Sequence, residues 1–201
     1  YILDCPEGAT LVVGHNAKDK EECAKMIHEG RWSEFIREVP IRKGDFVSIV
    51  PGTVHAIKAG VMLLETQQNS DITYRVYDYD RLSNGRKREL HIEKSIDVIN
   101  APASPAQDSI HNFANVRKNK PVLMEKSAYY KVWKLVVEDG SELQLSREKD
   151  FDSSYLLASV VAGSGYINGT AIKKGDHFIV TNECDSLSFS GDMEIILSAQ
   201  I

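Results

Sequence analysis

The sequence has few cysteines, no long hydrophobic run and no excess of positive charge. Its three cysteines, Cys5, Cys23 and Cys184, are widely spaced and form no CxxC pair. They predict reduced thiols rather than a disulfide framework. No apolar stretch approaches the roughly 20 residues that a membrane helix needs. A net charge of −5, with no basic stripe, argues against binding to nucleic acid.

What is present is typical of a globular protein. The 201 residues are 42% hydrophobic and 26% charged, which suits one large or two small domains with buried cores. No segment resembles a secretion signal, so we expect a cytoplasmic protein. The chain opens with YILDCPEG, an apolar strand without an initiator methionine. We therefore expect it to be part of a longer protein.

Most of the chain has the period of β-strands. A helical segment is the exception at 16–38, where Asn16 can cap a helix over 17–28, Gly30 can end it, and a second helix fits 33–38. Short strands at this spacing indicate a β-sandwich or jelly roll. They are expected at 1–4, 10–13, within 40–77, and at 90–98, 129–138, 141–145, 155–162, 165–167, 177–180, 186–189 and 193–199.

A short internal repeat suggests two related β domains. The residues IRKGD at 41–45 recur as IKKGD at 172–176, and Tyr1 upstream matches Tyr155. The first copy is longer between these anchors by the length of the predicted helical segment. Chance similarity is the alternative, because the repeat is short. In this register His55 falls opposite Ser186, so the second copy lacks the histidine.

His55 is the first candidate for a functional residue. It follows the Pro51-Gly52 turn and begins a strand. A sheet fixes the direction of such a ring, which suits a metal ligand. An isolated histidine is more often a structural residue with satisfied hydrogen bonds.

Several motifs together resemble a known family. Gly44 and the PGTVH run at 51–55 resemble the second conserved motif of cupins, whose histidine binds metal. With LETQQ at 64–68, TYRVYD at 73–78 and RELH at 88–91, the sequence resembles the short bacterial form of class I mannose-6-phosphate isomerase. The resemblance is specific in the first half of the chain. The second half is similar to the family's noncatalytic C-terminal cupin mainly in the order of its strands.

This resemblance implies a mainly β protein with two cupin-type jelly-roll domains. Residues 1–100 would be the C-terminal portion of the catalytic domain, incomplete and carrying the helical insertion at about 16–38. Residues 101–112 would be a linker, and residues 113–201 the noncatalytic domain.

The resemblance also implies a site and a reaction. The family holds one zinc ion, of whose ligands only His55 would lie in this chain, the others being upstream of Tyr1. Arg75 matches the family's catalytic arginine. Glu65 could transfer a proton or orient His55, or it could simply end a strand in water. An ion pair of Arg75 with Asp71 or Asp78 is the structural alternative to a catalytic role.

The implied reaction interconverts mannose 6-phosphate and fructose 6-phosphate through an enediol. It needs a base with a pKa near neutrality and a positive group for the developing charge. Arg75 suits the second role because its guanidinium stays charged. Arg81 and Lys87 could meet the substrate phosphate or lie in a solvated loop. We expect His15, His91, His111 and His177 to be structural or exposed.

Two other functions stay open. One is a noncatalytic cupin regulator that binds a sugar phosphate, and the other is a metal-dependent cupin oxygenase. A small-molecule sugar phosphate is the expected partner, with no nucleic acid and no membrane, and the oligomeric state is open. We expect the fragment to be inactive by itself.

Overall fold

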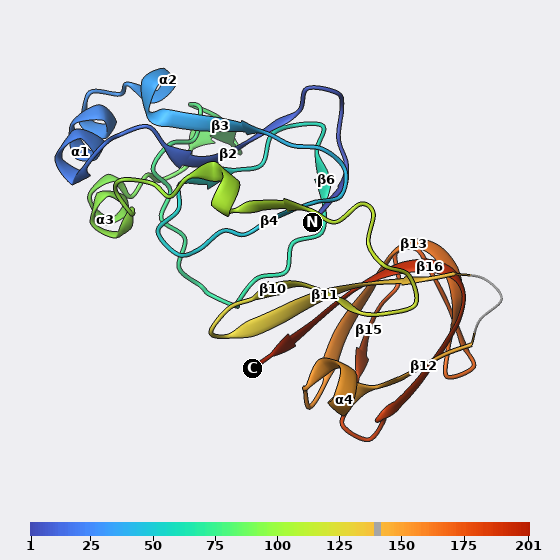
Figure 1. The fold of residues 1–201 in the computed structure, drawn as a ribbon. Helices are drawn as coiled ribbons and strands as arrows, with labels where there is room; N and C mark the ends of the chain where they lie inside the picture. The colour runs from blue at the N-terminus through green and yellow to red at the C-terminus, as the bar shows by residue number, and fades with distance from the viewer. Residues whose placement is uncertain (139–141) are drawn as a thin grey trace. The chain divides into compact units, whose positions relative to one another are not determined.

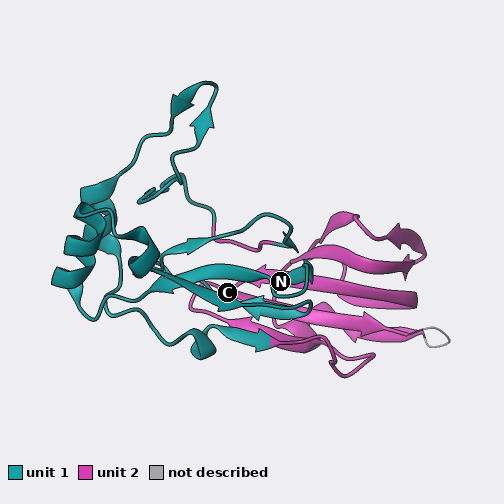
Figure 2. Cartoon of the chain, turned by 90° about the horizontal axis from the view of Figure 1, so that it is seen from above, with its two compact units in different colours: residues 1–64, 69–111 teal, residues 65–68, 112–201 magenta. Residues whose placement is uncertain are grey.

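A computed structural model describes residues 1–138 and 142–201. The chain forms two compact units, residues 1–64 with 69–111, and residues 65–68 with 112–201 (Figure 2). Among the described residues, strands outnumber helices in both units (Figure 1), which confirms the predicted mainly β fold class. In the part of the chain that the structure describes, every helix is too short or too polar to span a membrane.

Strand β2 lies at the centre of the first unit, between β3 and β5. Residues 11–15 of β2 are all buried, so the strand reads as a continuous apolar run rather than an alternating one. Small two-stranded sheets, the antiparallel pairs β1 with β6 and β7 with β8 and the pair β4 with β9, complete this unit. Its strands are β1 (Ile2–Asp4), β2 (Thr10–His15), β3 (Ile36–Pro40), β4 (Asp45–Val47), β5 (His55–Ala56), β6 (Met62–Leu63), β7 (Leu82–Ser83), β8 (Arg86–Lys87) and β9 (Ile110–Asn112).

The predicted helical segment is present, with two corrections. Helix α1 (Lys20–His28) is capped by Asp19, whose carboxylate accepts the amide of Glu22 at 2.8 Å. The prediction of Asn16 as the cap is wrong, because its amide donates to the carbonyl of Glu34 instead. Helix α2 (Trp32–Phe35) ends earlier than predicted. Its predicted last turn pairs with β2 as strand β3, where backbone pairing overrides the helical pattern.

Residues 90–98 form a helix rather than the predicted strand. Helix α3 (Ile92–Val98) buries Ser95 and Ile96, and Ile99 is buried just beyond its end. These positions also fit the helical spacing of three and four residues, which the alternating reading overlooked. The helix packs into the cluster that holds Phe35 and Cys23. The residues expected as a linker include a short 3-10 helix, η1 (Ala106–Asp108), and strand β9.

The second unit is a larger antiparallel sheet built around two long strands. In order it runs β10 (Val122–Lys126), β11 (Tyr130–Val137), β16 (Ser186–Gln200), β13 (Leu156–Ile167) and β14 (Thr170–Lys173). Strand β12 (Leu143–Ser146) also pairs with β16, and β15 (His177–Val180) with β13. The strand predicted at 141–145 thus begins outside the described residues. One cluster of apolar side chains, which includes Trp133, Leu135, Phe189 and Leu197, fills the inside.

The two long strands bend where glycines let them come close. Each was predicted as two separate strands, at 155–162 with 165–167 and at 186–189 with 193–199. Gly163 in β13 lies opposite Met193, and Gly191 in β16 lies opposite Gly165. Both Gly163 and Gly191 have positive φ, 71° and 108°. Because the backbone stays paired through the bend, each strand remains continuous.

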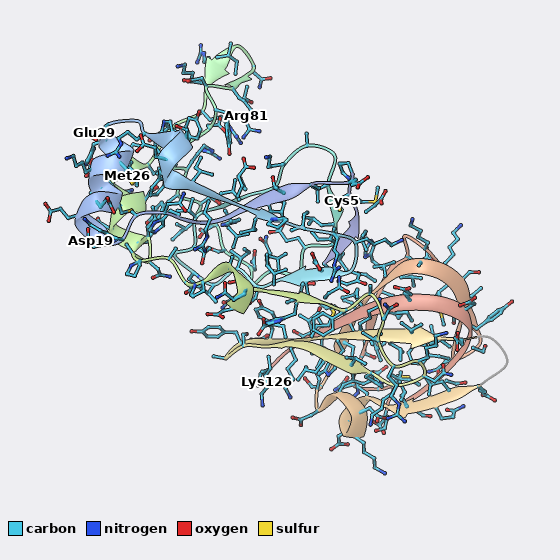
Figure 3. All side chains as sticks on the ribbon, turned by 45° about the horizontal axis from the view of Figure 1, so that its top comes forward. Cys5, Asp19, Met26, Glu29, Arg81 and Lys126 are labelled. Atoms are coloured by element: carbon cyan, nitrogen blue, oxygen red, sulfur yellow. The ribbon has the colours of Figure 1, made fainter. Side chains whose placement is uncertain are left out.

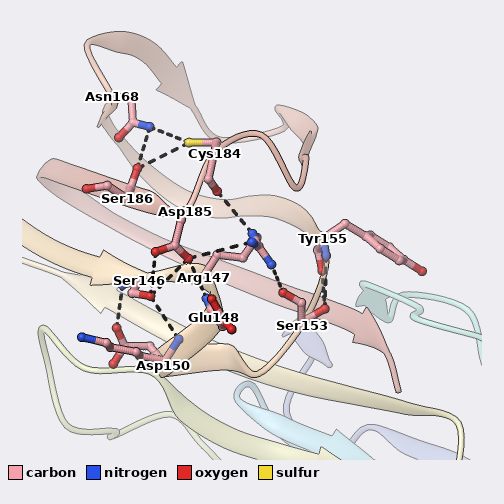
Figure 4. A network of polar contacts seen from close by, with 11 residues as sticks. Ser146, Arg147, Glu148, Asp150, Ser153, Tyr155, Asn168, Cys184, Asp185 and Ser186 are labelled. Atoms are coloured by element: carbon pink, nitrogen blue, oxygen red, sulfur yellow. Dashed lines mark hydrogen bonds and ion pairs between the residues drawn. The ribbon is translucent and has the colours of Figure 1, made fainter.

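A polar network joins helix α4 (Arg147–Phe151) to the turn before β16 (Figure 4). The Nε atom of Arg147 donates to the carbonyl of Cys184 at 3.3 Å, and its Nη1 donates to the carbonyl of Ser153. Asp185 accepts the amide of Glu148 at 3.0 Å. The Arg147 side chain is largely buried, so its two bonds are partly shielded from water and help to fix the turn, while the bond of Asp185 is exposed.

The internal repeat is confirmed at its turns. Asp45 accepts the amide of Arg42 on its carboxylate, and Asp176 accepts that of Lys173, both at 2.8 Å. The glycine of each turn donates to a preceding strand, Gly44 to the carbonyl of Ile2 and Gly175 to that of Val160. By these bonds Ile2 corresponds to Val160. The predicted match of Tyr1 with Tyr155 would instead set Ile2 against Leu156, so it is wrong.

Candidate active site

His55 is held by the strand and turn that the sequence predicted. It pairs with Val13 of β2, and its Nδ1 lies 2.9 Å from the carbonyl oxygen of Thr53. Because a carbonyl can only accept, Nδ1 is the donor in this bond. The neutral ring then carries its lone pair on Nε2. A backbone carbonyl that fixes the tautomer in this way is typical of metal-binding histidines.

The segments that carry His55 are tied to the residues after α3. The amide of Asn100 donates to the carbonyl of Gly52 at 3.0 Å, and its side chain donates to that of Pro51 at 2.8 Å. His55 itself is exposed. Within residues 1–138 and 142–201, no group of three or more His, Cys, Asp or Glu side chains could hold a metal ion. His55 therefore fits one coordination position, where a tight zinc site needs three or more.

Arg75 is anchored through its backbone and its side chain to the segment before α3. Its amide donates to Nδ1 of His91 at 3.2 Å, and its carbonyl accepts the amide of His91 at 2.8 Å. Its Nη1 donates to the carbonyl of Glu89 at 3.2 Å. The described residues include no ion pair of Arg75. Its charge is therefore not neutralised by Asp71 or Asp78, the structural alternative that the sequence left open.

Asp78 pairs with two other arginines. Its carboxylate receives Nε and Nη2 of Arg88, the first at 2.7 Å, and Nη2 of Arg81 at 2.7 Å. Hydrogen bonds from Arg88 first, and then those from Arg81, hold the pKa of Asp78 far below its usual range. The carboxylate is only 6% exposed. Arg81 lies beside the β7–β8 hairpin (Figure 3), and its guanidinium forms an ion pair with Asp78. The Nζ atom of Lys87 lies 2.6 Å from Oδ1 of Asp80.

Aromatic rings connect the same loop to the helical segment. The Trp32 ring stacks on Tyr77 with centroids 4.5 Å apart and planes 11° apart. Tyr77 also contacts Tyr79 at 4.5 Å, and the guanidinium of Arg81 lies 5.7 Å from the Tyr79 ring centroid. Such contacts stabilise a loop because the rings bury apolar surface and attract each other and the guanidinium in preferred orientations. The TYRVYD loop is thus fixed on one side by Trp32 and on the other by residues 88–91.

Glu65 is exposed and lies two residues beyond the end of β6. Residues 65–68 cluster with the second unit. The role of Glu65 in proton transfer or in orienting His55 therefore stays a prediction from the sequence. His55 and Arg75 both lie in the first unit, and within the described residues no hydrogen bond or ion pair joins them.

His15 is a buried structural residue, one of the alternatives expected for it. Its Nε2 lies 2.9 Å from the carbonyl of Asn100, and its Nδ1 accepts the amide of Ala17 at 3.2 Å. Burial, foremost, lowers the pKa of His15. The positive charges of Arg37 and Lys20 act in the same direction, and the bond to Asn100 opposes them. The neutral ring fits because it uses one nitrogen as donor and the other as acceptor.

The sequence reasoning missed the pairing of Asp78 with Arg88 and of Arg75 with His91. Arg88 belongs to a run of three basic residues at 86–88, and Asp78 holds its guanidinium. One signal could have shown that the two motifs lie near each other, because Asn84-Gly85 is a typical hairpin turn. Counting outward from it sets Asp78 opposite His91, which is three residues out of the register of the observed pairs. The structure has this hairpin, with positive φ at both turn residues.

Comparison with known proteins shows what the chain is similar to. Residues 123–200 match the family model of the mannose-6-phosphate isomerase cupin domain. Mannose-6-phosphate isomerase of Streptococcus mutans is 42% identical over 207 residues, and ManA of Bacillus subtilis is 40% identical over 203. Each match covers 98% of this chain and 62% of the relative, so the chain spans about three fifths of their length.

Solved structures agree. The crystal structure of the mannose 6-phosphate isomerase from Bacillus subtilis superposes with a TM-score of 0.79 and 34% identity, over 98% of this chain and 62% of that one. A putative mannosephosphate isomerase from Archaeoglobus fulgidus shares the fold alone, with a TM-score of 0.65 and 15% identity.

The chain is thus a mainly β protein whose residues 123–200 match a cupin domain. In sequence and in fold it is similar to proteins named as mannose-6-phosphate isomerases, so the resemblance predicted from its motifs is confirmed.

Proposed function

We propose that the protein to which this chain belongs interconverts mannose 6-phosphate and fructose 6-phosphate in the cytoplasm. The observation that carries the proposal is the identity of 38–42%, over 98% of the chain, to proteins named as mannose-6-phosphate isomerases, some of them as putative or probable ones. The isomerase activity is inferred from the names of those relatives.

The reaction moves one proton from C2 to C1 of the aldose, and a second from the O2 hydroxyl to O1. A base removes the C2 proton to give an enediol, and negative charge develops on the sugar oxygens. Arg75 offers a forked set of donors that forms no ion pair within the described residues, which suits it to stabilise that charge. Its guanidinium cannot serve as the base, because it does not deprotonate.

His55 is the residue of this chain that would hold a zinc ion, through Nε2. A bound zinc would supply Lewis acidity toward the sugar oxygens. The role of His55 in the chain itself is to present an unprotonated Nε2 in a fixed direction, which the Thr53 carbonyl achieves. We propose Glu65 as the residue that transfers the proton or orients His55.

The test is a coupled isomerase assay on the complete protein, with and without a chelator. Arg75→Ala should lower kcat by about 100- to 1000-fold, because one charged donor to the transition state is lost. Metal content should not change. Arg86→Ala is the matched control, since Arg86 is an exposed arginine on β8 and should leave kcat unaltered.

Two results would contradict the proposal. Binding of mannose 6-phosphate without turnover, in metal-loaded protein, would support the noncatalytic regulator instead. Equal loss of metal and of turnover in Arg75→Ala would make Arg75 a structural residue.

A further inference from the structure

The loop that carries Arg75 is one strand-like arm of a longer hairpin. The Arg75 amide donates to Nδ1 of the His91 ring and the Arg75 carbonyl accepts the His91 amide, while Asp78 pairs with Arg88 through its side chain. The two pairs lie three residues apart on each arm, so they keep one antiparallel register. The short ladder of β7 and β8 follows in a register shifted by three residues, with Leu82 opposite Lys87.

The backbone between these two parts is unusual. Tyr79 and Asp80 both adopt left-handed conformations, with φ of 54° and 52°. Two successive non-glycine residues in this region are costly and persist only where surrounding contacts hold them. Asp78 supplies such contacts: its carbonyl accepts both the amide of Arg81, at 3.1 Å, and its Nε, at 3.2 Å.

Asp78 is the one buried acidic group in this part of the described chain. The Arg75 guanidinium donates to the Glu89 carbonyl at 3.2 Å, on the opposite arm. The position of that carbonyl relative to Arg75 depends on what holds the two arms together. The twin hydrogen bonds from Arg88 to Asp78, next to Glu89, provide that hold, and a forked pair of this kind fixes direction as well as distance.

We infer that Asp78 is a positioning residue that aligns Arg75 for catalysis by locking the arm of Arg88 and Glu89 against it. The inference rests on the proposed function of Arg75. Asp78 touches neither substrate nor reacting atoms; it acts through Arg75. A charged donor must meet developing charge within a fraction of an ångström, so a loosened arm should lower kcat more than it raises KM.

A double-mutant cycle tests this in the complete protein. Asp78→Asn keeps the shape of the side chain but turns one acceptor into a donor facing an arginine. It should lower kcat about 10- to 100-fold with Arg75 present. With Arg75→Ala as the background, the same change should lower kcat less than twofold. Asp80→Asn is the control, since Asp80 is exposed and pairs only with Lys87 among the described residues; it should leave kcat unchanged.

A second measurement does not depend on turnover. Hydrogen exchange at the amides of Arg75 and His91 should become at least tenfold faster in Asp78→Asn and stay unchanged in Asp80→Asn. If Asp78→Asn does not fold, Arg88→Lys takes its place in the cycle, because it keeps the charge and loses the fork.

The outcomes separate the two proposals. Equal losses of kcat in both backgrounds, or unaltered exchange at Arg75, would overturn the positioning role while leaving the isomerase intact. Full activity of Arg75→Ala would overturn the proposed function of Arg75, whatever the exchange data show. The inference is supported if Asp78→Asn lowers kcat only where Arg75 is present and also speeds hydrogen exchange at the amides of Arg75 and His91.

Discussion

The bend of the long strands in the second unit gives a sharp prediction for Gly163→Ala. A Cβ atom built on Gly163 would lie 2.0 Å from the carbonyl oxygen of Asp192, roughly 1.4 Å short of the 3.4 Å at which ordinary contact begins. Its next neighbours, at 2.9 Å, are also backbone atoms of Asp192 and Met193, so no side chain can rotate away. Strand β16 would have to move.

Two costs add in this variant. A left-handed backbone costs a non-glycine residue about 1–2 kcal/mol. Overpacking against a fixed neighbour costs a further 1–3 kcal/mol or so. We therefore expect the free energy of unfolding of the second unit to fall by about 2–5 kcal/mol. Gly169→Ala is the matched control: its φ is 77°, but its Cβ would meet no atom within 4 Å, so only the first cost applies.

The assay is urea unfolding followed by tryptophan fluorescence. The chain has two tryptophans, so Trp32→Phe leaves Trp133 as the single reporter. Trp133 lies in the core of the second unit, edge-on to Phe151 with ring centroids 5.4 Å apart. If Gly163→Ala destabilised this unit no more than Gly169→Ala, the close approach of β13 and β16 at the bend would be refuted.

Two further predictions concern buried ionisable groups. Because burial lowers the pKa of His15, the unfolded chain takes up its proton first as pH falls; the free energy of unfolding should drop below about pH 6.5, by at most about 1.4 kcal/mol per pH unit. Thermal or urea unfolding between pH 7.5 and 5 should show this slope, and His15→Asn should lack it; equal slopes would contradict the assignment. The Lys134 side chain is 1% exposed, and its Nζ atom lies 2.9 Å from Oε2 of Glu194. Glu194→Leu should therefore cost about 3 kcal/mol, more than Lys134→Met, in urea unfolding; the reverse order would show that the ion pair does not govern stability there.

The local features that the sequence predicted well depend on neighbours along the chain. The helix expected over 17–28 forms as α1, although Asp19 caps it in place of Asn16, and β15 coincides with the predicted strand at 177–180. The two IxKGD turns form the same hydrogen bonds because the aspartate and its amide partner are three residues apart. Turn geometry of this kind is fixed by a few residues, whatever surrounds them.

The errors fall where contacts distant in sequence decided the outcome. Residues 36–38 were expected in a helix, yet they belong to β3, because their backbone pairs with that of β2. Residues 92–98 alternate like a strand, but the apolar cluster around Phe35 selected the helical face. Propensity is a weak preference, and a sheet edge or an apolar cluster outweighs it.

The candidate site divides in the same way. The sequence by itself determined which residues to consider, since the histidine after the Pro-Gly turn and the arginine of TYRVYD stand in motifs that can be recognised along the chain. Only the tertiary structure decided which groups contact them. The Thr53 carbonyl orients the His55 ring, and Asp78 accepts hydrogen bonds from Arg88 rather than from Arg75. The physical reason is that a side chain's partners are set by how the backbone folds back on itself, and the motif alone leaves that choice open.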